Sequence, residues 1–92
     1  MAMLTMYVDR GVRSSIARQY LKNLGIAFEE VNITVNKDAA NFLIEQSRPV
    51  SEFNMPQFYV GNTLVWANGF KDVAGLTLEQ INEKVEEINA SN

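Results

Sequence analysis

Few side chains in this sequence could take part in chemistry, and the best candidates fall in two short stretches. Arg10, Arg13 and Ser14 lie close together near the amino terminus, and Asp72 stands in the second half of the chain. Two arginines in one polar stretch favour binding of an anionic ligand. A serine hydroxyl becomes a nucleophile only beside a general base, and there is no histidine to supply one. Ser14 is therefore expected to cap a helix rather than to react.

Two residue types that carry much of enzyme chemistry are absent, since the chain contains neither cysteine nor histidine. Without them, zinc, haem and iron–sulfur clusters have essentially no protein ligands here. A catalytic triad of serine, histidine and aspartate is excluded. Disulfide bonds are excluded as well, so cysteine usage gives no information about the compartment.

Length and composition indicate one small globular domain, residues 1–92, with 47% hydrophobic residues. The net charge of −3 argues against a nucleic-acid partner, because phosphate contacts need clustered lysines and arginines. No apolar run reaches the roughly 18 residues of a membrane span, so no membrane partner is expected. A cytoplasmic location is the default expectation.

Hydrophobic patterning predicts two strands and two helices in the first half of the chain. The first helix should begin at Ser14 or a close neighbour and end before Gly25, which suits the position after a helix terminus. Asn36 is expected to cap the second helix. The predicted ranges are a strand at 4–8, a helix at about 14–24, a strand at 26–34 and a helix at about 37–46.

The second half predicts a β-hairpin followed by helical segments. Strands are expected at 57–60 and 63–66, joined by Gly61-Asn62 as a two-residue turn. A short helical turn over 70–74 should be closed by Gly75. Thr77 and Gln80 form a capping box at the start of the last helix.

Apolar residues at helical spacing are expected to face the core. Trp66 is expected to pack at an edge or on the surface, with partner anchoring as the alternative. The inward-facing helical residues are predicted to be Ile16, Ala17, Tyr20, Leu21, Leu24, Ala39, Ala40, Leu43, Ile44, Leu78, Ile81, Val85 and Ile88.

The predicted element order is β-α-β-α-β-β-α. The first β-α-β unit gives two parallel strands, and the hairpin adds two antiparallel ones. The sequence therefore predicts an α/β domain with a mixed four-stranded sheet flanked by helices.

Three motifs in this order resemble the glutaredoxin family, whose members have a thioredoxin-like fold. The stretch 21–33 is similar to the end of the family's first helix and its second strand. Asn54-Met55-Pro56-Gln57-Phe58 resembles the signature before the third strand, and Gly69-Phe70-Lys71-Asp72 resembles a later glycine–aromatic turn. Each motif is weak by itself, but their joint order and spacing are specific, and the resemblance covers nearly the whole chain.

The resemblance implies thiol–disulfide chemistry, yet this chain departs from it at the decisive positions. Gly11-Val12-Arg13-Ser14 matches the place of the family's two-cysteine motif, with Gly11 at the nucleophile and Ser14 at the resolving position. A register shift of one residue supplies no cysteine either. The nucleophile of thiol exchange is a thiolate, so that exchange is excluded for this sequence.

The resemblance also implies a binding site for glutathione or a cysteinyl peptide, with no cofactor required. The implied ligand-binding residues are Arg10, Arg13, Met55, Pro56, Gly69, Phe70 and Asp72. Met55 would offer backbone groups beside a cis peptide bond to Pro56, and Asp72 would receive the γ-glutamyl ammonium. The alternatives are that the two arginines are solvated loop charges, and that Asp72 is a turn residue or a helix cap.

Three functional hypotheses are open at this point. The first is a redox-inactive relative of glutaredoxins, a pseudoenzyme of the redox-homeostasis family, that keeps glutathione or peptide binding. The second is an interaction module that docks a protein through the Met55-Pro56 face. The third is an active glutathione-dependent oxidoreductase whose cysteines were replaced by engineering. Ser14 suits that third hypothesis, whereas Gly11 does not, because serine or alanine is the usual replacement.

Overall fold

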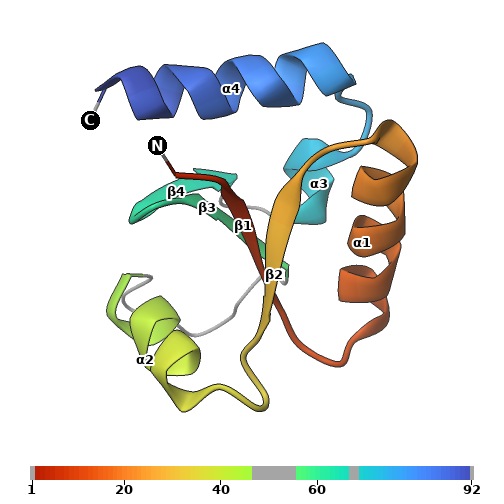
Figure 1. The fold of residues 1–92 in the computed structure, drawn as a ribbon. Coiled ribbons are helices and arrows are strands. Elements are labelled where there is room, and N and C mark those ends of the chain that lie inside the picture. Colours follow the sequence, from red (N-terminus) through yellow and green to blue (C-terminus); the bar gives the residue numbers. More distant parts are fainter. Residues whose placement is uncertain (1, 47–55, 67–68, 92) are drawn as a thin grey trace.

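The computed structural model describes residues 2–46, 56–66 and 69–91 (Figure 1). A mixed sheet runs through the middle of the molecule, with helices on both sides. None of the described helices is long and apolar enough to cross a membrane. The elements are β1 (Leu4–Val8), α1 (Val12–Leu24), β2 (Phe28–Asn32), α2 (Lys37–Gln46), β3 (Gln57–Val60), β4 (Thr63–Trp66), α3 (Phe70–Val73) and α4 (Leu78–Ser91).

The four strands lie in the order β2-β1-β3-β4. β1 and β2 are parallel, and they pair Leu4 with Phe28. β3 is antiparallel to both β1 and β4. The α/β architecture expected from the sequence, with a mixed four-stranded sheet flanked by helices, is therefore confirmed.

The sheet has two unequal faces. The first face packs against α1, α3 and α4, and α2 lies on the opposite side in Figure 1. Leu43 of α2 packs on the second face with Tyr59 of β3. Strand alternation sends neighbouring residues to opposite faces. The core of the first face consists of Leu4, Met6, Val8, Ala17, Leu21, Ile26, Phe58, Val60, Trp66, Val73, Ile81 and Ile88.

Local signals set the ends of several elements as predicted. Gly25 caps α1 at its carboxyl end in the left-handed conformation. The Asn36 side chain accepts a hydrogen bond from the Ala39 amide at 3.0 Å, at the start of α2. Thr77 and Gln80 exchange the two reciprocal hydrogen bonds of a capping box, at 2.9 and 3.2 Å. These ends need only residues a few positions apart, so the sequence predicts them well.

Three apolar residues predicted to face the core are exposed instead: Ile16 is 49% exposed, Ile44 51% and Leu78 38%. The buried stripe of α1 runs through Ser14, Ala17 and Leu21, and α2 buries Ala39 and Leu43. Each helix thus buries a narrower stripe than its apolar pattern predicted. Leu78 is the first residue of α4, ahead of the buried Ile81. β2 is also shorter than predicted, with five residues.

Trp66 lies on β4, an edge strand as predicted, but its side chain is buried in the core of the first face rather than on the surface. The cause is an irregularity in the pairing of β3 with β4. Phe58 pairs with Trp66 while Tyr59 pairs with Leu64, which leaves Val65 as an extra residue on β4. Such a bulge reverses the alternation of faces. The Trp66 ring therefore meets the Phe58 ring, with centroids 5.6 Å apart.

Candidate functional site

The predicted site residues converge on the end of the sheet where β1 finishes. The chain leaves β1 at Val8 and reaches the start of α1 at Val12 through a three-residue loop. The antiparallel register pairs Tyr7 with Gln57, so the buried Pro56 lies next to the end of β1. The structure thus brings Pro56 and the positions 11–14 to the same end of the sheet.

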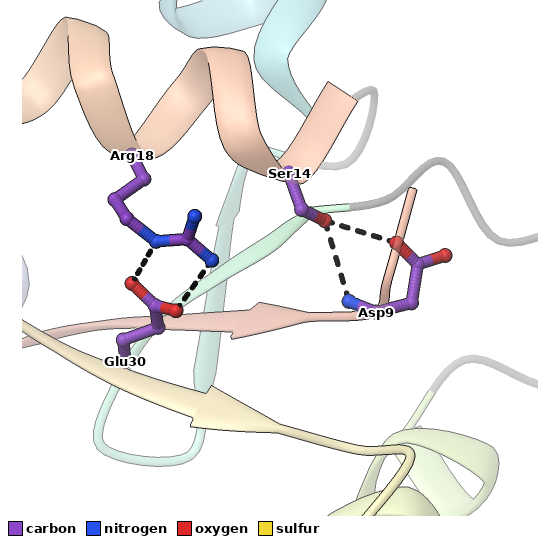
Figure 2. A network of polar contacts seen from close by, with 4 residues as sticks. All are labelled: Asp9, Ser14, Arg18 and Glu30. Atoms are coloured by element: carbon purple, nitrogen blue, oxygen red, sulfur yellow. Dashed lines mark hydrogen bonds and ion pairs between the residues drawn. The ribbon is translucent and has the colours of Figure 1, made fainter. Parts of the chain in front are cut away.

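A polar network centred on Asp9 shapes this loop (Figure 2). The Asp9 carboxylate accepts a hydrogen bond from the Gly11 amide at 2.8 Å and another from the Ser14 hydroxyl at 3.1 Å. The Ser14 oxygen in turn accepts a bond from the Asp9 amide at 3.3 Å. Ser14 is fully buried and lies inside α1, so the predicted capping role is wrong. Its hydroxyl ties the first turns of α1 back to the end of β1.

Gly11, which occupies the position of the nucleophilic cysteine in the resemblance, is the residue that precedes α1. A Cβ atom at Gly11 would lie only 3.0 Å from the Asp9 Oδ1 atom. That oxygen is held by two hydrogen bonds, so a side chain here would have to displace it. A side chain at position 11 would therefore push the Asp9 carboxylate aside by a few tenths of an ångström.

The first turn of α1 presents a positive end to solvent. No side chain caps this helix terminus and no acidic residue stands in the first turn. Arg10, Val12 and Arg13 are all exposed there, Val12 by 75%. The helix dipole and two guanidinium groups favour an anion at the same place. The Asp9 carboxylate already lies beside this terminus, where it accepts from the Gly11 amide, and binding of a further anion by the two arginines stays a prediction.

Gly69, Phe70 and Asp72 lie at the start of α3. The Gly69 amide donates to the Trp66 carbonyl at 3.2 Å, which keeps Gly69 close to the end of β4. Its backbone has φ 66° and ψ −139°, a conformation that residues other than glycine avoid. The Asp72 amide donates to the Gly69 carbonyl at 3.1 Å, and Asp72 is half-buried in the first turn.

The Phe70 ring connects this turn to α1. It meets the Tyr20 ring edge-on, with centroids 5.4 Å apart. The Tyr20 hydroxyl donates to the Leu76 carbonyl at 2.8 Å and accepts from the Gly75 amide at 3.0 Å. α1 and α3 are thus held against each other, and with them the two stretches of predicted site residues. Met55 and its predicted cis bond lie outside the described residues.

One ion pair lies deeper along α1. Arg18 Nε and Nη2 donate to the two carboxylate oxygens of Glu30 on β2, both at 2.7 Å (Figure 2). The hydrogen bonds from Arg18 lower the pKa of the Glu30 carboxyl, and those to Glu30 raise the pKa of Arg18. This pair clamps α1 to the outer strand and takes Arg18 away from any ligand.

Asp9 is a residue of this site that the sequence analysis did not single out. The signal was present: aspartate two residues before glycine is a common way to close a tight turn. For metals the result is plain, since the described residues include no group of three or more acidic, histidine or cysteine side chains suited to hold an ion.

Comparison with known proteins adds nothing to the geometry: no protein-family model matches this chain, and neither does any curated protein. The resemblance to the glutaredoxin family therefore rests on the motifs and on the order of elements.

Proposed function

We propose that this chain is a glutaredoxin-like domain of thioredoxin fold that binds glutathione or a cysteinyl peptide without thiol chemistry. The order of elements and the mixed sheet agree with that fold. The observation that carries the binding proposal is the uncapped first turn of α1, with exposed Arg10 and Arg13, beside the buried Pro56. No cofactor is needed for such a role.

Each part of the site has a role in this proposal. The first turn of α1 and its arginines receive the glycine carboxylate of glutathione. Met55 and Pro56 pair with the peptide backbone of the ligand, as in a short strand addition. Gly69 and Phe70 shape the turn from which Asp72 receives the γ-glutamyl ammonium.

The geometry around Gly11 argues against engineered cysteines. In a protein altered only at its reactive thiols, the space of the former side chain would be open. Here the hydrogen-bonded Asp9 carboxylate lies 3.0 Å from the Cβ position at Gly11. This contact favours the redox-inactive hypothesis over the engineered one.

A titration with reduced glutathione, followed by backbone amide shifts, tests the proposal. We expect saturable shifts clustered at Arg13 and Asp72, with affinity in the millimolar range or tighter. Asp72→Asn removes only the charge and should weaken binding by roughly tenfold, since hydrogen bonds to charged groups are worth about 1.5–3 kcal/mol. Asp38→Asn, an exposed change on α2, is the matched control and should leave affinity unaltered.

Two results would contradict the proposal. The absence of shifts at cellular glutathione concentrations would exclude ligand binding, and equal effects of Asp72→Asn and Asp38→Asn would remove Asp72 from the site. A hydroxyethyl-disulfide reductase assay should show no turnover, because the chain has no thiol.

The second candidate function is docking of a protein partner at the same end of the sheet. The observation that favours it is Val12, a valine 75% exposed between two arginines at the start of a helix. A protein surface with an apolar pocket and acidic rim would complement it. Val12→Ser should then abolish capture of that partner.

A further inference from the structure

A second concave site lies at the opposite end of β1 from the candidate functional site. It is a groove of about 270 Å³ between α4 and the amino ends of β1 and β2. Its apolar lining includes Leu4, Ile26, Ala27 and Val85. Leu4 and Ile26 belong to the buried core, so the floor of the groove is rigid. The strand rise places its Leu4 end about 13 Å from Val8, where the first site begins.

The polar rim of the groove comes from one stripe of α4, formed by Asn82, Glu86 and Asn89. Asn89 is already engaged: its side chain accepts from the Ala2 amide and donates to the Ala2 carbonyl, both at 2.9 Å. It therefore acts as a fixed wall that holds the start of β1 against α4. Glu86 is exposed and brings a carboxylate to the rim of an apolar groove.

The solvent side of α4 is acidic from Glu79 to Glu87. Four glutamates are exposed along it, and the helix has one basic residue, Lys84. The Lys84 Nζ atom lies 3.9 Å from a carboxylate oxygen of Glu87, so its charge offsets Glu87 rather than Glu86. A groove with this rim attracts a cationic group and repels an anionic one. The exposed glutamates are Glu79, Glu83, Glu86 and Glu87.

The size of the groove selects among cationic occupants. Pockets for drug-sized molecules span roughly 300–1,000 Å³, so about 270 Å³ suits one long side chain better than a free ligand of that size. Lysine and arginine bury an aliphatic stem and keep the charged head in water. Their stem matches the apolar floor and their head reaches the rim.

We propose that this groove is a docking site for a basic protein segment, anchored by one lysine or arginine side chain. The stem lies against Met3, Ala27 and Val85, and the cationic head pairs with Glu86. The neighbouring glutamates of α4 receive the other basic residues of the segment. Because the groove and the glutathione site lie at opposite ends of β1, both can be occupied at once, and neither proposal depends on the other.

The test uses the full chain and a blocked heptapeptide of alternating glycine and basic residues, with arginine at the centre. We expect saturable amide shifts at Ala27 and Val85. Glu86→Gln should weaken binding by about threefold, the scale of an exposed ion pair. Glu79→Gln makes the same change of charge outside the groove and should weaken binding clearly less. Ala27→Leu fills the groove and should abolish the shifts, with circular dichroism confirming the fold.

Several outcomes would overturn the proposal. Equal losses for Glu86→Gln and Glu79→Gln would indicate attraction to the acidic helix without a groove. Unchanged affinity of a peptide with norleucine in place of the central arginine would exclude a cationic anchor. Equal binding of the corresponding glutamate peptide, or no saturable shift at peptide concentrations of about 1 mM, would exclude the site altogether.

Discussion

The two faces of the sheet differ in how completely they are covered. The first face buries residues from β1, β3, β4 and three helices in one continuous core. In the described part of the second face, Leu43 and Tyr59 are the fully buried members, with Tyr7, Ile33 and Phe42 packed around them. Stability follows buried apolar area, so we infer that the first face carries most of it.

The two faces also differ in how the hydroxyl groups of their tyrosines are hydrogen-bonded. On the first face, the buried part of Tyr20 ends in a hydroxyl with two hydrogen bonds. On the second face, the buried Tyr59 hydroxyl has no hydrogen-bond partner among the described residues. The Tyr59 ring contacts both the Tyr7 and the Phe42 rings, with centroids 5.4 and 5.2 Å apart. The pKa of Tyr7 is raised, mainly because its own hydroxyl is partly buried, and to a smaller extent because Tyr59 and Glu29 lie nearby.

The comparison also explains where function is expected. α1 and α3 belong to the well-packed first face, and they present the uncapped helix end, Gly69 and Asp72. A binding site works best when rigid elements hold it. α2, on the second face, contributes no residue to either proposed site. Among the described residues, the proposed glutathione site therefore belongs to the face with the larger buried core.

The largest expected loss of stability comes from replacing one buried leucine by alanine on each face. Leu21→Ala on the first face should lower the free energy of unfolding by about 4 kcal/mol, and Leu43→Ala on the second by about 2 kcal/mol. Both leucines are fully buried, so the chemistry is matched. The structure around Leu43 should relax more easily into the cavity left by the substitution, because fewer described residues pack around it. Urea denaturation measures both, and equal losses would remove the inferred difference in stability.

Smaller changes in the free energy of unfolding are expected from removing the hydroxyl groups of two tyrosines, and the two changes should have opposite signs. Tyr59→Phe removes a buried hydroxyl without a described partner and should raise the free energy of unfolding by about 1 kcal/mol. Tyr20→Phe removes two hydrogen bonds and should lower it by about 1–1.5 kcal/mol. Thermal unfolding of both variants decides the question. Destabilisation by Tyr59→Phe would show that a polar partner, such as a buried water, satisfies this hydroxyl.

The smallest effect concerns the Arg18–Glu30 pair, which ties α1 to β2. The side chains are 33% and 30% exposed, so Glu30→Gln should cost only about 0.5–1 kcal/mol at neutral pH. The pKa of Glu30 is lowered in the folded state, so this contribution is present above the unfolded pKa. It is lost as the pH falls through the lowered pKa. Stability curves of both proteins should therefore converge below about pH 4, and a constant difference would contradict the ion pair.

Much of the fold could be predicted because its signals are local. Gly25, Asn36 and the pair Thr77–Gln80 define helix ends within a few residues, and the Gly61-Asn62 turn defines the hairpin. The candidate site was predicted in part for the same reason. Arg10 and Arg13 follow the first predicted strand directly, so they were expected near the start of the first helix.

The features that could not be predicted depend on contacts between residues that are far apart in the sequence. An extra residue in β4 turns Trp66 into the core, and the sequence shows no sign of it because the bulge exists only in the pairing with β3. Ile16 and Ile44 are exposed because, within the described part of the chain, no element covers their side of α1 and α2.

The sequence by itself determined the order of the elements, several of their ends and the absence of any thiol. Only the tertiary structure decided that Asp9 occupies the space beside Gly11, that Phe70 and Tyr20 join α3 to α1, and that α4 closes a groove over the start of β1. The physical reason is that caps and turns are settled by neighbours along the chain. Packing, in contrast, depends on which surfaces meet once the whole chain has folded.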